Sequence, residues 1–294
     1  MRVTAAADFL PVATELGELA ARYAERGEGG PPAGAPARAW AELTSGGWLA
    51  MGLETPGGPG VLELAEVARA WGAHLVPVPF ITTMLGCRWR DSADLAAAGQ
   101  AMTCSISTPA GPMAPFAGWP GIDILGAAGA AADGPVTGAA APRLTELPGE
   151  DFAPSLAAGI CDAASLVGPQ ARRELAALWA AETIGGAQDV LNRSVAYARQ
   201  RQAYGQLIGS YQAVAHLLAE MHRDTQFGWS AVVWAAQGGP DAVEAARAAI
   251  GLAADVIRGG IQVHGGIGFT WDLGLHRYLR HAIALAELTA GLAP

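Results

Sequence analysis

Residues 199–221, RQRQAYGQLIGSYQAVAHLLAEM, contain a break inside a helical pattern, and this break decides how the fold is interpreted. Apolar residues recur at helical spacing on both sides of Gly205, and glycine is a poor residue for a helix interior. The stretch therefore predicts an elbow between two long helices. Arg201 could hold a phosphate there through its planar, permanently charged guanidinium, and Tyr204 could stack on a flat ring. A plain turn with a solvated Arg201 also explains the pattern, and spacing alone favours it.

A second glycine-rich stretch, QVHGGIGFTWDLGLHRYLR, occupies residues 262–280. Gly265, Gly266 and Gly268 would allow a ligand to approach the backbone closely. The stretch follows a helical pattern, whereas a dinucleotide-binding fingerprint follows a strand, so we reject that fingerprint. A tight helix–helix turn is an equally good explanation from spacing alone. His264 is predicted to belong to the core or to this turn.

Helical periodicity dominates the chain on both sides of the elbow. Toward the C-terminus it predicts an up-down four-helix bundle in a domain of residues 169–294, with helices over 170–200, 206–237, 240–260 and 272–290. Toward the N-terminus it predicts a helical domain of residues 1–100, with helices over 1–25, 39–51 and 61–72. The segment 101–168 between them is rich in Gly, Ala, Pro, Thr and Ser and predicts short strands and loops, with a surface loop over 126–142. The predicted fold class is mainly α with a small middle β region.

Composition excludes several classes of function. The 294 residues carry a formal net charge of −9, which argues against nucleic acid as the main partner because phosphate binding needs basic patches. Three distant cysteines without CxxC spacing indicate reduced thiols. We find no signal-peptide pattern at the N-terminus and no apolar run of about 18 residues that could span a membrane. The sequence therefore predicts a cytoplasmic protein without a membrane partner.

The histidines do not have the spacing of metal ligands. His216 and His222 are six residues apart, His276 and His281 are five apart, and no Cys or carboxylate cluster completes either pair. The sequence predicts no metal site.

Three carboxylates of the predicted bundle are candidates for acid–base chemistry, namely Glu174, Glu182 and Glu220. For each of them a solvated helix face is the simpler explanation. The chain also lacks the G-x-S-x-G pattern of a nucleophilic serine.

Together the two glycine-containing stretches resemble one family. YARQRQAYGQLIGSYQAVAHLLAEM is similar to the Arg-x-x-Phe-Gly…Phe-Gln…Leu-Ala-Asp-Met signature of acyl-CoA dehydrogenases, and QVHGGIGFT…LHRYLR resembles their second C-terminal signature. WAELTSGGWLAMGLETPGGPG, residues 40–60, is similar to the Trp-x-x-Leu…Gly-Trp…Gly-Gly-x-Gly pattern of their N-terminal domain. The resemblance extends over most of the chain and is densest over 180–290.

This resemblance implies a flavin enzyme that inserts an α,β double bond into an acyl-CoA thioester. In the family a carboxylate takes the α-proton and FAD takes the β-hydride. The subunits share the FAD: the middle β domain of one subunit holds the isoalloxazine, and the bundle of its neighbour holds the pyrophosphate and adenine. By the match, Arg201 would grip the pyrophosphate, Tyr204 would pack on the cofactor and Gln212 would support the elbow. The remaining implied contacts, to the ADP part, would come from Gln262, Gly265 and Gly266.

Two departures from the family pattern imply that this chain lacks catalytic residues of its own. The middle region 101–168 is shorter than the family's β barrel and lacks the usual Thr-Glu-Pro…Gly-Ser-Asp run. Thr289 stands where one branch of the family has its catalytic glutamate. The position used by another branch falls on Leu175, and its neighbour Glu174 would point about 100° away on a helix.

Because of these departures, the chain resembles the shortened subunit of the heterotetrameric (α2β2) bacterial dehydrogenases that act on CoA thioesters of sterol side chains. A full-length acyl-CoA dehydrogenase subunit would then supply the carboxylate and the acyl pocket, and electron-transfer flavoprotein would be the electron acceptor. Two alternatives stay open. The chain could be a self-sufficient homomeric dehydrogenase using Glu174, or a scaffold subunit without a role in the chemistry.

Overall fold

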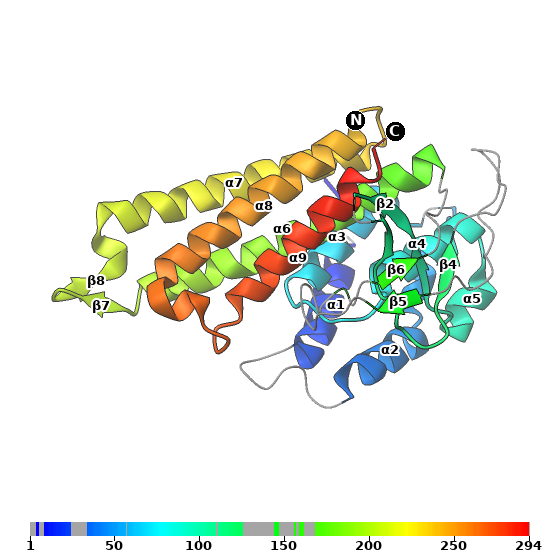
Figure 1. Ribbon diagram of the computed structural model, residues 1–294, viewed down its shortest axis with the longest axis horizontal. Helices are drawn as coiled ribbons and strands as arrows, with labels where there is room; N and C mark the ends of the chain where they lie inside the picture. The colour runs from blue at the N-terminus through cyan, green and yellow to red at the C-terminus, as the bar shows by residue number, and fades with distance from the viewer. Residues whose placement is uncertain are drawn as a thin grey trace.

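The computed structural model describes residues 4–5, 9–24, 34–56, 58–109, 111–125, 144–146, 156, 159–161 and 168–293. Helices make up most of this part of the chain, and Figure 1 shows a long helical bundle at one side and shorter helices with small sheets at the other. The mainly helical fold class predicted from the sequence is therefore confirmed.

Local features of the sequence explain where some of the N-terminal helices begin and end. The helix α3 (Val61–Gly72) has the bounds expected from periodicity, and the Glu63 carboxylate at its start accepts a hydrogen bond from the Gly60 N–H (3.1 Å). The second expected helix, 39–51, is instead α2 (Ala35–Ser45) followed by a 3₁₀ turn, η2 (Trp48–Gly52). Gly47 separates the two with a left-handed φ of 72°, which glycine tolerates best. The remaining helices of this region are α1 (Leu10–Tyr23), α4 (Phe80–Arg90) and α5 (Ala93–Ala98).

Short strands follow, as the sequence predicts for residues 101–168. Strands β1 (Met102–Cys104) and β4 (Asp123–Leu125) form a parallel pair, with Thr103 opposite Ile124. An antiparallel sheet has the order β2-β3-β6-β5, formed by Ile106–Thr108, Gly111–Ala114, Gly159–Cys161 and Leu144–Glu146. The surface loop expected over 126–142 lies outside the described residues.

The described residues 168–293 contain the four long helices of the expected bundle: α6 (Pro169–Ala198), α7 (Gln212–Ala236), α8 (Ala242–His264) and α9 (Leu275–Ala290). They lie side by side in Figure 1. The helix α6 contacts α3, α7, α8 and α9, and most of its residues are buried. A helix enclosed on several sides has no polar face, so its sequence shows little amphipathicity.

Glycines allow α6 to approach α3 closely. A Cβ atom at Gly185 would overlap the carbonyl oxygen of Arg69, and one at Gly72 would overlap the carbonyl oxygen of Glu182. The backbones therefore touch where the N-terminal helices cross the bundle. A third close approach lies at the C-terminal end of α9. A Cβ at Gly291 would overlap the carbonyl oxygen of Ser107, so the end of α9 is in close contact with β2.

Candidate functional site

The elbow after α6 is a small β-hairpin. Strands β7 (Gln202–Ala203) and β8 (Gln206–Leu207) pair antiparallel around Tyr204 and Gly205, whose φ angles are 50° and 83°. Positive φ at both central residues is typical of a type I′ turn, which matches the twist of a two-residue hairpin. The hairpin corrects the expected helix 206–237, which begins only at Gln212.

Hydrogen bonds fix this hairpin to the ends of the neighbouring helices. The Arg201 N–H donates to the carbonyl of Tyr197 (2.8 Å), and the Ile208 N–H donates to the carbonyl of Arg201 (2.9 Å). The Tyr211 hydroxyl donates to the carbonyl of Ala203 (2.9 Å). The hairpin is thus held at its base, while its tip projects beyond the bundle in Figure 1.

The side chains predicted to meet a cofactor are open to solvent on this hairpin. Tyr204 is 99% exposed at the tip, and Arg201 is also exposed. Gln212, the first residue of α7, is exposed too.

The glycine-rich stretch forms the turn between α8 and α9. Gly265 ends α8 with φ 62° and ψ −140°, a conformation that only glycine adopts readily, and the 3₁₀ turn η4 (Gly265–Phe269) follows. A Cβ atom at Gly265 or Gly266 would have no atom within 4 Å, so both backbones face open space. Gln262, on the last turn of α8, is exposed as well.

His264 supports this turn from the core side. It is buried, its Nδ1–H donates to the carbonyl of Gly260 (2.8 Å), and its ring stacks on Tyr197 at a centroid distance of 4.5 Å. Burial lowers the pKa of His264, so the neutral ring is favoured. The expectation of a core or turn histidine is therefore confirmed.

The hairpin and the glycine turn lie at the same end of the bundle. The stacking of Tyr197, near the end of α6, on His264, at the end of α8, shows that these two helices end together. Figure 1 shows β7 and β8 beyond this end. We call it the hairpin end; it carries Arg201, Tyr204, Gln212, Gln262, Gly265 and Gly266.

The chemistry of the hairpin end suits an anionic ligand with a flat ring. A guanidinium, a side-chain amide and exposed backbone N–H groups can donate hydrogen bonds to a diphosphate, and the Tyr204 ring offers a stacking surface. None of the six predicted residues is a carboxylate, so this set can hold a ligand but has no base for proton abstraction. These residues fit the ADP part of a dinucleotide.

Glu174 is not on a solvated face, which corrects that expectation. It is 6% exposed, because α6 packs against α4. Its carboxylate accepts hydrogen bonds from Trp89 Nε1 (2.8 Å) and Gln170 Nε2 (3.0 Å), and Arg88 Nε lies 3.5 Å from it. The adjacent Leu175 is fully buried. The Glu174 carboxylate is thus occupied by contacts within the chain.

Glu182 also contradicts the expectation of a solvated face, whereas Glu220 is exposed as expected. Glu182 is 7% exposed, and its Oε1 lies 3.3 Å from Nε2 of the buried His281 on α9. Both glutamates lie on the enclosed helix α6, where an acidic residue needs a partner.

Thr289, at the position of the glutamate in one family branch, is fully buried near the end of α9. Its hydroxyl has no hydrogen-bond partner among the described residues. A side chain in this place has no access to a ligand.

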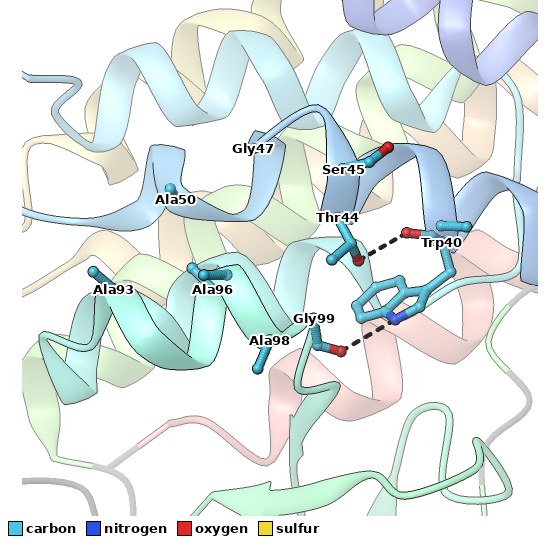
Figure 2. Close-up of a pocket in the computed structure, with 11 residues that line it drawn as sticks. Trp40, Thr44, Ser45, Gly47, Ala50, Ala93, Ala96, Ala98 and Gly99 are labelled. Atoms are coloured by element: carbon cyan, nitrogen blue, oxygen red, sulfur yellow. Dashed lines mark hydrogen bonds between the residues drawn. The ribbon is translucent and has the colours of Figure 1, made fainter.

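A groove that sequence reasoning missed lies on the N-terminal helices. About 860 Å³ in volume, it runs between α2 and α5 (Figure 2), where the Trp40 indole N–H donates to the carbonyl of Gly99 (3.2 Å). A neighbouring groove of about 600 Å³ shares Trp40 and Gly99 and adds Trp119, whose ring packs edge-on to Trp40. Neither groove is lined by a titratable side chain, so neither has the means for acid–base chemistry.

The described ranges lack two further kinds of feature. No three His, Cys, Asp or Glu side chains gather there as a possible metal site. No helix in that part of the chain is both long enough and apolar enough to cross a bilayer.

The C-terminal part of the chain matches a known family. Residues 174–289 match the model of the acyl-CoA dehydrogenase C-terminal domain. Acyl-CoA dehydrogenase IpdE2 of Mycobacterium tuberculosis is 35% identical over 150 residues, which are 50% of this chain and 43% of that protein. The chain spans less than half the length of the curated relatives it matches.

Solved structures show the same fold over nearly the whole chain. A chain of the ChsE4-ChsE5 complex from Mycobacterium tuberculosis superposes with a TM-score of 0.69 and 21% identity, over 99% of this chain and 97% of that one. A chain of the Tcur3481-Tcur3483 steroid ACAD variant gives 0.65 and 20%, over 95% and 91%. Residues 174–289 thus match the acyl-CoA dehydrogenase C-terminal domain family, and the chain as a whole has the acyl-CoA dehydrogenase fold.

Proposed function

We propose that this chain is one subunit of a FAD-dependent acyl-CoA dehydrogenase and contributes the ADP-binding half of a FAD site shared with a full-length partner. The observation that carries the proposal is the hairpin end, where Arg201, Tyr204 and the backbone of Gly265 and Gly266 are open to a ligand. The match of residues 174–289 to the acyl-CoA dehydrogenase C-terminal domain supports FAD as that ligand.

Each residue of the hairpin end has a defined role in this proposal. Arg201 binds the pyrophosphate through its guanidinium, and Gln212 supports the elbow from the start of α7. Tyr204 packs on the cofactor. Gln262 meets the ADP part through its amide, and Gly265 and Gly266 do so through their backbone. When bound, FAD supplies the ring that accepts the β-hydride of the acyl-CoA thioester.

The partner subunit supplies what this chain lacks. Thr289 is buried and Glu174 is held by Trp89, Gln170 and Arg88, so neither position offers a free base. In the proposed α2β2 assembly, the full-length subunit contributes the catalytic carboxylate and binds most of the acyl-CoA, and electron-transfer flavoprotein takes the electrons. The fold likeness to a steroid ACAD and to a chain of a two-component complex supports a sterol side-chain thioester as the substrate class.

The visible absorbance of the purified chain tests this proposal. We expect no flavin band from the chain alone and about one FAD per heterodimer when it is co-purified with its full-length partner. Arg201→Ala should reduce the FAD content of the complex. Arg247→Ala, which removes an exposed α8 arginine paired with Glu244, should not. A stoichiometric flavin band from the lone chain would overturn the shared-site proposal.

The same experiment separates the two alternatives. A scaffold subunit predicts a complex whose FAD content and turnover survive Arg201→Ala. A self-sufficient homomeric enzyme predicts flavin and turnover in the isolated chain, with Glu174 as its base.

A further inference from the structure

Arg193 connects α6 to the segment that carries the glycine turn. Its guanidinium Nη2 donates to the carbonyl of Leu273 (2.5 Å), 80 residues later in the chain. Leu273 lies between the turn η4 and the start of α9. A hydrogen bond from a charged donor is among the stronger ones in proteins. Arg193 therefore holds the C-terminal arm of the loop 265–274.

Further contacts fix the guanidinium itself. Asp189, one turn earlier on α6, places its Oδ2 3.7 Å from Arg193 Nη1. The Tyr278 hydroxyl lies 3.1 Å from the same Asp189 oxygen and 2.9 Å from the carbonyl oxygen of Ala73, so its proton has two acceptors. Ala73 follows the last residue of α3. A polar chain thus runs from Leu273 through Arg193, Asp189 and Tyr278 to the N-terminal helices.

The loop needs such a tie because much of it is exposed. Ile267, Phe269 and Trp271 are exposed apolar side chains, and Gly265 and Gly266 have no neighbour within 4 Å of a Cβ position. The Thr270 hydroxyl donates to the carbonyl of Ile267 (2.7 Å), which is a bond within the loop itself. A bond from α6 instead anchors the loop to the bundle, and anchoring lowers the entropy that a ligand must remove on binding.

We propose that Arg193 is a positioning residue for the cofactor half-site, holding the loop 265–274 where the backbone of Gly265 and Gly266 meets the ADP part of FAD. This inference rests on the proposed function. Arg193 acts on the cofactor through Leu273 and the loop.

The test uses the complex of this chain with its full-length partner and two variants of one residue. Arg193→Met keeps most of the side-chain length but removes every donor, whereas Arg193→Lys keeps a charged donor. FAD affinity is measured by titration of the deflavinated complex, and hydrogen exchange is measured on peptides covering 262–275. The thermal midpoint and the KM for acyl-CoA are recorded for each variant.

We expect Arg193→Met to raise the Kd for FAD about tenfold, the scale of one lost hydrogen bond to a charged group. Exchange in the loop should accelerate, while the KM for acyl-CoA stays unchanged. Arg193→Lys should restore most of the FAD affinity. If Arg193→Met lowers the thermal midpoint too far for titration, Tyr278→Phe replaces it. That variant loses the hydroxyl that contacts Asp189 and the carbonyl of Ala73 but leaves Arg193 in place, and a smaller rise in Kd is expected.

Arg201→Ala, measured alongside, distinguishes failure of this inference from failure of the proposed function. If Arg201→Ala loses FAD but Arg193→Met retains the wild-type Kd, Arg193 does not position the loop for the cofactor. Unchanged exchange in the loop overturns the inference equally. If neither variant affects FAD, the proposed half-site itself is wrong, and this inference falls with it.

Discussion

At the scale of single residues, the role of Glu174 can be tested directly, because a structural role and a catalytic role predict different effects of one substitution. Its carboxylate is buried and is occupied by Trp89, Gln170 and Arg88. We expect Glu174→Gln to lower the free energy of unfolding by about 1–3 kcal/mol, because Arg88 loses a buried charge partner. Turnover of the complex should stay unchanged, since the Glu174 oxygens face protein. Urea unfolding and steady-state kinetics measure the two effects. Lost turnover with wild-type stability would instead support Glu174 as a base.

Thr289 offers a matched pair of substitutions in one buried place. Thr289→Val keeps the shape and removes a buried hydroxyl that has no hydrogen-bond partner among the described residues, so a gain of up to about 1 kcal/mol is expected. Thr289→Glu, which restores the family residue, should cost more than about 3 kcal/mol because it buries an unpaired charge. Denaturant unfolding gives both values. A stable Thr289→Glu chain with dehydrogenase activity of its own would contradict this account.

At the scale of elements, the crossing of α3 and α6 depends on glycine. A methyl group at Gly185 would overlap the carbonyl oxygen of Arg69, which is backbone and cannot rotate away. We expect Gly185→Ala to lower the free energy of unfolding by about 1–3 kcal/mol, the usual cost of overpacking. Chemical denaturation of the purified chain measures the change.

Gly251 on α8 is the control for this crossing. It lies in the middle of a helix, and a Cβ there would have no atom within 4 Å. Gly251→Ala should therefore stabilise the chain by about 1 kcal/mol through helix propensity alone. If both alanine variants changed stability in the same direction, close packing at Gly185 would not be the cause.

The elements that the sequence predicted well are those with a periodic pattern. The bounds of α3 were predicted correctly and those of α9 to within a few residues, because each shows one apolar face. The helix α4 was missed because residues from Phe80 to Cys87 include no charged side chain and so show no polar face in the sequence. The hairpin after α6 was read as a break in a helix, since two-residue strands leave no alternating pattern.

The candidate site shows the same division between local and long-range information. Gly205 and Gly265 could be identified from the sequence because a backbone position with positive φ favours glycine. The resemblance to a family supplied the roles of Arg201 and Gln262, which remain predictions. The contact of Arg193 with Leu273 could not be predicted, because 80 residues separate them and Arg193 belongs to neither glycine-containing stretch. Two of the partners of Glu174, Trp89 and Arg88, likewise come from α4, a helix that the sequence did not reveal.

At the scale of the whole molecule, polar contacts join the N-terminal helices to the bundle. Arg88 connects Glu174 on α6 with Glu54, and Tyr278 on α9 contacts the carbonyl of Ala73. Together with the close crossing at Gly72 and Gly185, these contacts make the N-terminal helices and the bundle one packed body. Because these parts pack as one body, we expect them to unfold together, so that a titrating group in the bundle contributes to the stability of both.

The pH dependence of unfolding follows from this coupling. Burial lowers the pKa of His264 below its ordinary value of 6.5, so the folded chain binds fewer protons at this site than the unfolded chain. The stabilising contribution is fully present above pH 6.5 and is lost as the pH falls from there toward the folded-state pKa. The pKa of His276 is lowered as well, by burial first and then by Arg280 and Arg277, and it acts in the same direction.

His264→Gln isolates the contribution of His264. Glutamine can still donate to the carbonyl of Gly260 but does not titrate, whereas His276 and the buried Glu66, whose raised pKa acts in the opposite direction, are common to both chains. Urea unfolding at pH 7.5, 6.5 and 5.5 should show a steeper loss of stability on acidification in the wild type than in the variant. Parallel pH profiles would mean that His264 gains its proton without cost, and that the ring stacked on Tyr197 is open to water in solution.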